Sequence, residues 1–211
     1  MLDHEYSLLG GFNRVRIGQI LAIGASLISG LLIFILLYFV DIAGRWGIPV
    51  NVPPMVFALL GAGSVFTFLY WVFNRYLWRC HLLSHLLNVP DLHGEWHCLG
   101  KTLNAQGEVT RDWSGTITIA QCWDKIRLQL KTSTSTSNSI CAALMYDEMN
   151  GYRILYNYRN DPKMGVTELT THIGFADLWI DKNAQTGEAS YFNGRGRTTF
   201  GTFTLKRKNH R

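Results

Sequence analysis

The chain has 211 residues, of which 47% are apolar, and its formal net charge at neutral pH is +5. About 90 residues belong to an N-terminal segment and two long apolar runs, so the remaining residues suffice for one compact domain and exclude two of ordinary size. The sequence contains no nucleophile elbow, P-loop, H-E-x-x-H motif or dinucleotide-binding turn. We therefore do not expect an enzyme.

A transmembrane hairpin is predicted over residues 17–79, after a short N-terminal segment of residues 1–16. The first apolar run, residues 17–40, is uncharged, and as a helix it exceeds the roughly 30 Å of a bilayer's hydrocarbon core. The second run, residues 55–73, is also uncharged and follows Pro53 and Pro54, which suit the first turn of a helix. A cleaved signal peptide is the alternative for the first run. The apolar core of a signal peptide, however, spans only about 7–15 residues, and here a longer run is followed directly by a second one.

Basic residues near the two runs predict that both ends of the chain face the cytoplasm. Arg14 and Arg16 precede the first run, and Arg75 and Arg79 follow the second. The connecting loop holds a single arginine, Arg45. Because positively charged residues favour the cytoplasmic side, the loop is expected on the opposite side of the membrane.

An all-β domain is predicted over residues 90–211, where apolar side chains recur at every second position. Ile126, Leu128 and Leu130, for example, alternate with polar neighbours. Turn-forming residues separate eight predicted strands, near residues 92–103, 110–120, 124–132, 138–147, 151–159, 169–180, 188–194 and 198–207. Eight sequential strands with short connections fit an up-and-down antiparallel barrel, because closure removes exposed edges; an open sandwich is the alternative.

The interior of such a barrel is either filled by side chains or holds one small ligand. Gly115, Gly174 and His172 stand where a packed core would carry larger apolar groups, which indicates a cavity. Glycine also marks bulges, and threonine in strands also faces water, so a filled interior is the alternative. The tract of residues 131–139 (KTSTSTSNS) is either a flexible connection or a wall of hydroxyl groups beside the cavity.

The expected ligand is anionic and planar. Arg195 and Arg197 follow glycines at a turn and offer planar donors for phosphate oxygens, although the same pattern suits a solvated hairpin tip. Aromatic side chains can stack on a base, although in strands they commonly belong to the core. The full set of predicted ligand-binding residues is Trp113, Ser135, Ser137, Tyr156, Tyr158, Asn193, Arg195 and Arg197.

No disulfide, metal or cofactor is expected. Cys80, Cys98, Cys122 and Cys141 form no C-x-x-C pair, and a cytoplasmic location favours free thiols. The alternation of His, Glu and His at positions 93, 95 and 97 would place three potential metal ligands on one strand face. No further ligand at a metal-site spacing accompanies them, so ordinary polar strand positions are the preferred interpretation.

The order of these parts is similar to that of a known family. After the hairpin come residues 90–96 (PDLHGEW), residues 113–121 (WSGTITIAQ), the serine and threonine tract, residues 156–158 (YNY), residues 172–174 (HIG) and the closing segment 191–201. Each motif is short, and the combination carries the resemblance. Over nearly its whole length the chain resembles the SMODS-associating two-transmembrane, β-strand-rich effectors of cyclic-oligonucleotide-based anti-phage signalling systems (CBASS).

The resemblance implies a function for both parts of the chain. A CD-NTase enzyme would make a cyclic dinucleotide on sensing phage, and the β-barrel would bind it. The protein would then oligomerise through its membrane segments and disrupt the bacterial inner membrane, killing the infected cell. The implied partners are a cyclic dinucleotide, the lipid bilayer, further copies of the chain and, functionally, a CD-NTase, with no DNA or RNA polymer.

Two other classes of protein remain as alternatives. One is a membrane-tethered, lipocalin-like barrel that binds a lipid or another apolar small molecule, which an unbroken aliphatic lining would favour. The other is a hydrolase whose site would first be sought at His172 with Asp177 or Glu168.

Overall fold

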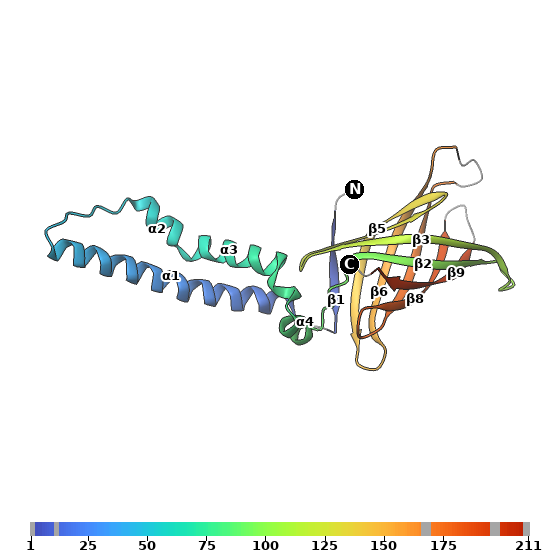
Figure 1. The fold of residues 1–211 in the computed structure, drawn as a ribbon, viewed down its shortest axis with the longest axis horizontal. Helices are drawn as coiled ribbons and strands as arrows, with labels where there is room; N and C mark the ends of the chain where they lie inside the picture. The colour runs from blue at the N-terminus through green and yellow to red at the C-terminus, as the bar shows by residue number, and fades with distance from the viewer. Residues whose placement is uncertain (1–2, 11–12, 166–169, 195–198, 209–211) are drawn as a thin grey trace. The chain divides into compact units, whose positions relative to one another are not determined.

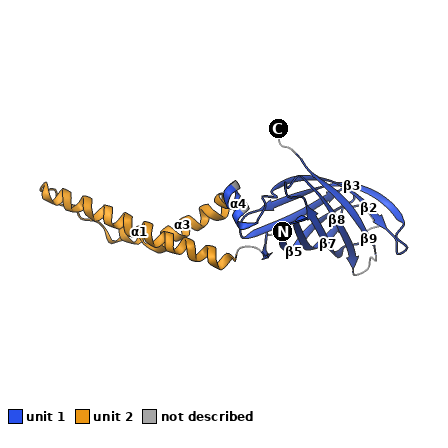
Figure 2. Cartoon of the chain, turned by 90° about the horizontal axis from the view of Figure 1, so that it is seen from below, with its two compact units in different colours: residues 1–11, 79–211 blue, residues 12–78 orange. Residues whose placement is uncertain are grey.

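The computed structural model describes residues 3–10, 13–165, 170–194 and 199–208. The chain forms two compact units, residues 12–78 and residues 1–11 together with 79–211 (Figure 2). The first unit is helical and the second is built around a β-sheet (Figure 1). The N-terminal segment therefore belongs to the same unit as the β domain, which the sequence analysis did not predict.

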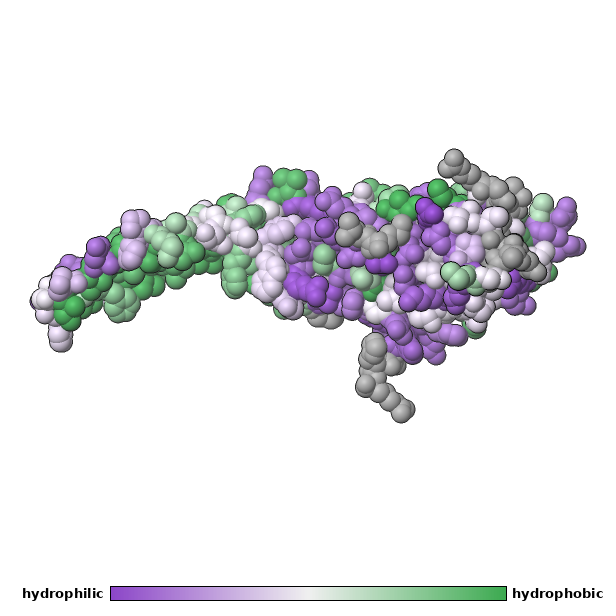
Figure 3. Space-filling view, turned by 90° about the horizontal axis from the view of Figure 1, so that it is seen from above, coloured by the Kyte–Doolittle hydropathy of each residue, from purple (hydrophilic) through white to green (hydrophobic). Residues whose placement is uncertain are grey.

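The helical unit contains α1 (Arg14–Arg45), α2 (Pro54–Leu60) and α3 (Ala62–Arg75). Within the described residues, α1 is the one helix that is long and apolar enough to cross a membrane alone; α2 and the helical stretch up to Arg79 qualify only as a pair bent by 41°. Ile20, Leu27 and Phe34 of α1 are more than half exposed, and apolar residues cover the helices in Figure 3. Apolar exposure on this scale suits contact with lipid.

The second predicted span is broken at Gly61, between α2 and α3. Glycine is a weak helix former, about 1 kcal/mol less favourable than alanine. Two serine side chains bond the carbonyl groups beside the break: Ser64 Oγ donates to Ala58 O at 3.1 Å, and Ser29 Oγ of α1 donates to Leu60 O at 2.5 Å. A helix can be interrupted away from water only when its freed backbone groups find such partners.

The short helices η1 (Leu77–Arg79) and α4 (His81–Leu87) lead into the sheet, and neither was predicted. Strands β2 to β9 form the predicted meander, in which each strand is antiparallel to the next and β9 pairs back with β2. The strands are β1 (His4–Leu9), β2 (Gly94–Leu103), β3 (Val109–Gln121), β4 (Lys125–Thr132), β5 (Ser135–Asp147), β6 (Gly151–Pro162), β7 (His172–Ile180), β8 (Thr186–Gly194) and β9 (Phe200–Arg207). They close into a barrel in the order β1-β4-β3-β2-β9-β8-β7-β6-β5.

The predicted count of eight strands is wrong by one, because β1 joins the sheet from the N-terminal segment. β4 and β5 pair directly at residues 129–131 with 136–138 and then separate. β1 fills the space between them, antiparallel to β4 at two positions and parallel to β5 at four. We call this space, bounded by residues 125–128 of β4 and 139–145 of β5, the fork.

The two ends of the barrel differ in how they are filled. Trp96, Ile119, Ile126 and Ile180 are buried at the end where β2 begins, and they form a solid apolar core there. Toward the end where β2, β4, β6 and β8 terminate, inward positions carry hydroxyl and amide side chains instead. Among the described residues, the barrel interior therefore leaves room for a ligand at this second end.

Candidate functional site

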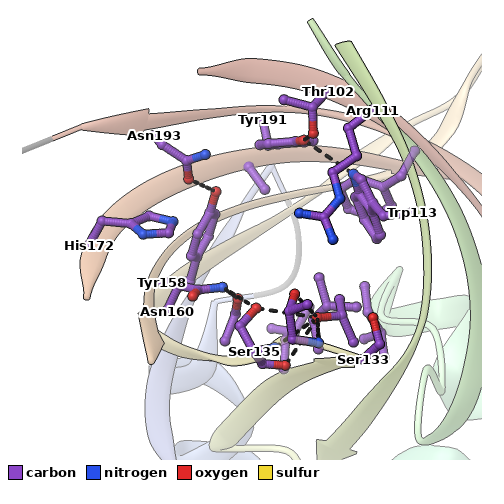
Figure 4. A pocket seen from close by; sticks show the side chains of 18 of the residues that line it. Thr102, Arg111, Trp113, Ser133, Ser135, Tyr158, Asn160, His172, Tyr191 and Asn193 are labelled. Carbon is purple, nitrogen blue, oxygen red and sulfur yellow. Dashed lines mark hydrogen bonds between the residues drawn. The ribbon is translucent and has the colours of Figure 1, made fainter. Parts of the chain in front are cut away.

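A cavity of about 110 Å³ lies inside the barrel at this end, and each of strands β2 to β9 contributes to its wall (Figure 4). Arg195 and Arg197 lie outside the described residues. The other six predicted ligand-binding residues all line the cavity: Trp113, Ser135, Ser137, Tyr156, Tyr158 and Asn193. Further lining residues, not selected from the sequence as ligand-binding, include Thr102, Arg111, Asn160, His172 and Tyr191.

Glycines in neighbouring strands allow two aromatic rings to lie against the barrel wall. Gly100 is the cross-strand partner of Trp113, and Gly174 is that of Tyr158. A Cβ atom at Gly100 would collide with the indole of Trp113, and one at Gly174 would collide with the phenol ring of Tyr158. Gly174, one of the two glycines that indicated a cavity, thus acts by giving an aromatic side chain a place beside it, and Gly100 does the same for Trp113.

The hydroxyl group of Tyr191 holds Trp113 in place. It lies 2.9 Å from Thr102 Oγ1 and accepts a hydrogen bond from Trp113 Nε1 at 3.2 Å. The rings of Trp113 and Tyr191 meet edge to face, with centroids 6.0 Å apart. An aromatic side chain fixed in this way is preorganised as a stacking surface.

The serine and threonine tract is a tight connection and a wall of the cavity. β4 ends at Thr132 and β5 begins at Ser135, so only residues 133 and 134 lie between the strands. Thr132, Ser133, Thr134, Ser135 and Ser137 all line the cavity. These hydroxyl groups therefore border the cavity, and their role in ligand binding stays a prediction.

Asn160 organises this wall and has one unused atom. Its Nδ2 group donates to the hydroxyls of Ser135 at 3.0 Å and Ser137 at 2.8 Å. Its carbonyl oxygen Oδ1 is buried and has no hydrogen-bond partner in the described part of the chain. Leaving such an acceptor unpaired costs about 1–3 kcal/mol.

Asn193, by contrast, uses both ends of its amide. Its Oδ1 atom accepts from the hydroxyl of Tyr158 at 2.8 Å, and its Nδ2 group donates to Thr199 Oγ1 at 2.8 Å. These bonds fix the Tyr158 ring at its outer end. Asn193 therefore acts on the cavity partly through Tyr158.

The charged groups at the cavity favour an anion. Arg111 makes no hydrogen bond or ion pair with any described residue, and its guanidinium points into the space between Trp113 and Tyr158 in Figure 4. His172, which also lines the cavity, has its Nδ1 atom 2.9 Å from the carbonyl of Thr170; that oxygen can only accept, so Nδ1 donates to it. Among the described residues that line the cavity there is no aspartate or glutamate.

The inner part of the site is electrically neutral. Burial raises the pKa of Tyr156, and the neighbouring Tyr158 raises it further, so the Tyr156 hydroxyl keeps its proton at neutral pH. Burial likewise raises the pKa of the Cys98 thiol to about 12, partly offset by a backbone hydrogen bond. A thiol in that state is neither a nucleophile nor a metal ligand near pH 7.

The hydrolase pair His172 and Asp177 is not assembled. The two residues are five positions apart on β7, so strand alternation places them on opposite faces. His172 lines the cavity, whereas Asp177 accepts two hydrogen bonds from Arg153, at 2.8 and 2.6 Å. The alternative partner, Glu168, lies outside the described residues.

Neither a metal site nor a purely apolar site is seen in the described residues. No group of three His, Cys, Asp or Glu side chains in that part of the chain is placed to hold a metal ion. Ile117, Leu128 and Leu130 give the cavity an apolar portion, but hydroxyl, amide and guanidinium groups interrupt it. The unbroken aliphatic lining that a lipid-binding barrel would favour is therefore not found.

An apolar helical unit joined to a barrel with a cationic, aromatic cavity has the architecture of a membrane-associated small-molecule receptor. Residues 87–207 match the family described as Cap15, cyclic dinucleotide receptor domain, and residues 15–79 match Cap15, TM helices. The chain is also 41% identical over 210 residues to CD-NTase-associated protein 15 of Yersinia aleksiciae, with 100% of both chains covered. The chain therefore belongs to the Cap15 family, which confirms the resemblance found in the sequence.

Proposed function

We propose that the chain is the membrane effector of an anti-phage CBASS system. Its barrel binds a cyclic dinucleotide made by a CD-NTase, after which the protein oligomerises, disrupts the bacterial inner membrane and kills the infected cell. The family match over both units supports a receptor joined to a membrane segment. The observation that carries the ligand assignment is a cavity with an unpaired arginine, ordered aromatic rings and no carboxylate among its described lining residues.

Each kind of lining side chain has a role in this proposal. Arginine contacts phosphate oxygens, aromatic rings stack on the bases, and hydroxyl, amide and imidazole groups bond the base edges. The assigned residues are Arg111, Arg195 and Arg197 for phosphate, Trp113, Tyr156 and Tyr158 for stacking, and Ser135, Ser137, Asn160, His172 and Asn193 for hydrogen bonding.

We also propose that α1 and the α2–α3 pair cross the inner membrane as a hairpin, with both termini in the cytoplasm. β1, which precedes α1, pairs with β4 and β5, which follow α3. Since both ends of the helical unit join the same sheet, the chain crosses a membrane an even number of times between them. Arginines at positions 14, 16, 75 and 79 support the cytoplasmic side for that sheet.

Catalysis is not needed for this function. A ligand that binds the assembled state more tightly than the dispersed state shifts the population toward assembly by its binding free energy alone. The proposed role of the cavity is therefore recognition, and the proposed role of the helices is to act on the bilayer once several copies are together.

Calorimetric titration of the full chain in lipid nanodiscs tests the proposal. The titrants are cyclic di-AMP, cyclic di-GMP and 3′,3′-cyclic GMP–AMP, with a linear dinucleotide and a fatty acid as controls. We expect saturable binding of at least one cyclic dinucleotide, weakened by added salt because phosphate contacts are ionic. Absence of binding by all three would overturn the receptor proposal, and binding of the fatty acid alone would favour the apolar-ligand class.

A further inference from the structure

β1 is the shortest of the described strands, and it is held in the fork by pairing along its edges and by side-chain bonds such as that from the Tyr6 hydroxyl to the carbonyl of Cys122 at 3.4 Å. It pairs with β4 through His4 and Glu5 and with β5 through residues 6–9. Tyr6 is its one buried side chain, at 2% exposure, and His4 Nε2 lies 2.7 Å from Ser139 Oγ. A six-residue strand with a single buried side chain leaves the sheet more readily than the longer meander strands do.

The barrel keeps its closure when β1 is taken away. β4 and β5 bond each other directly at residues 129–131 and 136–138, and β2 pairs with β9. Departure of β1 would therefore leave the eight meander strands connected and uncover the two strand edges of the fork. Unpaired strand edges accept another strand of matching register, and β1 of an identical chain has that register.

The connection between β1 and α1 suits a strand that moves. Gly10 directly follows β1 with φ at +75°, and nothing lies within 4 Å of the position its Cβ would occupy. Residues 10–13 are the whole link to α1. Exchange of a terminal element between identical chains has a low cost because the same bonds form again, and copies held in one membrane meet at high effective concentration.

The cavity and the fork share their walls. Leu128 of β4 and Ser137 of β5 line the cavity. Ser139, the next inward position on β5, accepts from the backbone N–H of Leu128 at 2.9 Å and contacts His4. A ligand bound at the hydroxyl wall therefore acts on the two strands between which β1 lies.

We propose that the fork accepts β1 from a second copy of this chain, and that ligand in the cavity favours this exchanged state. The inference rests on the oligomerisation in the proposed function and specifies its contact. Each copy donates β1 to the next and receives one from the previous copy. Such a head-to-tail contact builds rings or open arrays.

Disulfide trapping in full-length protein in membranes tests the exchange. Glu5 and Lys125 are exposed antiparallel partners across the β1–β4 pair. In a background with Cys80, Cys122 and Cys141 replaced by serine, one tagged chain carries Glu5→Cys and a differently tagged chain carries Lys125→Cys. The two chains are co-expressed, and the membranes are oxidised with and without the three cyclic dinucleotides named above. Because the two cysteines are in different chains, a mixed disulfide forms only by contact between chains.

The matched control uses Glu188→Cys in one chain and Thr204→Cys in the other. These residues are exposed antiparallel partners on β8 and β9, which stay paired within one chain. We expect the bound nucleotide to raise the Glu5–Lys125 mixed disulfide at least about fivefold, the low end of typical allosteric coupling, and to leave the control unchanged.

The outcomes separate this inference from the function it rests on. Nucleotide binding and oligomer formation without a mixed disulfide above the control would overturn strand exchange while leaving the receptor function intact. Failure of every nucleotide to bind would overturn the proposed function, and the exchange would fall with it. A double variant with Glu5→Cys and Lys125→Cys in one chain checks the geometry, since without nucleotide it should cross-link within the chain.

Discussion

Arg111 differs from the other arginines on the described strands in having no hydrogen-bonding or ionic partner. Arg127, Arg153 and Arg159 each bond a side chain, and Arg207 bonds backbone carbonyls. An unpaired guanidinium at the wall of a cavity keeps all its donors for a ligand. In the proposed function this guanidinium contacts phosphate, and composition and turn chemistry did not select it from the sequence.

We expect Arg111→Ala to weaken cyclic dinucleotide binding by roughly ten- to a hundredfold, since a hydrogen bond to a charged group contributes about 1.5–3 kcal/mol. Because the lost contact is ionic, the variant should also show a smaller dependence of affinity on salt. Calorimetry at two salt concentrations measures both effects.

Arg159→Ala is the matched control for this change. It removes the same charge from an exposed side chain that pairs with Asp161 on the same strand. Equal losses of affinity in the two variants would mean that only the overall charge of the barrel matters, and the phosphate role of Arg111 would be dismissed.

Cys98 gives the barrel a predictable sensitivity to alkaline pH. Its pKa lies near 9.0 without burial and is raised to about 12 in the folded barrel. The folded state therefore holds the proton more tightly, so this contribution to stability is complete below pH 9.0 and is lost as the pH rises toward about 12. Over that window the free energy of unfolding should fall by about 1.4 kcal/mol per pH unit for this one group.

Thermal melts of the full chain in detergent at pH 8 to 11, followed by tryptophan fluorescence, measure that slope. Cys98→Val should reduce the slope, most clearly between pH 9.0 and 10.0, below the range in which Tyr156 adds its own contribution. Replacement of the exposed Cys141 by serine should leave the slope unchanged. A slope that is the same in all three proteins would contradict the assignment to Cys98.

At the scale of elements, the pairing of glycine with an aromatic ring on the next strand shapes the cavity. Alanine at Gly100 or Gly174 should push the ring of Trp113 or Tyr158 away from the wall and into the space for ligand. We expect a loss of affinity of at least about tenfold, with a cost in stability of about 1–3 kcal/mol from overpacking.

Titration calorimetry and thermal melts separate the two effects. Ser114→Ala, next to Trp113 but on the exposed face of β3, is the control and should change neither. If Gly100→Ala and Gly174→Ala lowered the melting temperature and left the affinity untouched, the rings would not border the ligand.

The hydrogen bond between α1 and the break at Gly61 can be tested by mutation. Ser29 donates from α1 to the carbonyl of Leu60, whereas Ser26 donates to Ala22 within its own helix. Ser29→Ala should destabilise the helical unit by about 0.6 kcal/mol, the average for hydrogen bonds between membrane helices, and by at most about 1.7 kcal/mol. Ser26→Ala should have a smaller effect.

Unfolding of the full chain in mixed micelles with increasing SDS, read by tryptophan fluorescence, compares these serine variants. A larger loss of stability in Ser26→Ala than in Ser29→Ala would show that the bond to Leu60 contributes nothing to the helix pair.

The sequence predicts the meander well because alternation is a local property. Trp113 lies on the inward face of its strand, and every second residue of a strand shares one face. Alternation alone therefore predicts that Arg111 also points inward. It was not selected because a charged side chain is typical of a surface position. Which end of the barrel is hollow depends on the volumes of side chains from eight strands together, and no single segment shows it.

β1 is the strand that was not predicted from the sequence, because it forms only by pairing with distant residues. Its six residues, HEYSLL, carry a weak strand pattern, and their partners lie more than a hundred positions later at Ile126 and Ala142. The broken second span is missed for a related reason. A hydropathy pattern measures apolar content, whereas the break at Gly61 depends on side chains that bond the freed carbonyls.

For the molecule as a whole, β1 restricts membrane topology independently of charge. A strand before α1 and strands after α3 can be hydrogen-bonded in one sheet only if both are on one side of the bilayer. An odd number of crossings between residues 10 and 79 would separate them. Since α1 is long enough to cross alone, the bent α2–α3 pair is expected to return the chain to the starting side.

Single-cysteine labelling in spheroplasts checks this topology. Three proteins each keep one accessible cysteine: Ser7→Cys on β1, Asn51→Cys in the loop between α1 and α2, and native Cys141 on β5, all exposed in the structure. A membrane-impermeant maleimide should label Asn51→Cys in intact spheroplasts and the other two only after lysis. Labelling of Ser7→Cys and Cys141 from opposite sides of the membrane would contradict the pairing of β1 with the barrel. Protection of all three cysteines in intact spheroplasts would show that the loop at Asn51 does not reach the outer side, which would contradict a membrane-crossing hairpin.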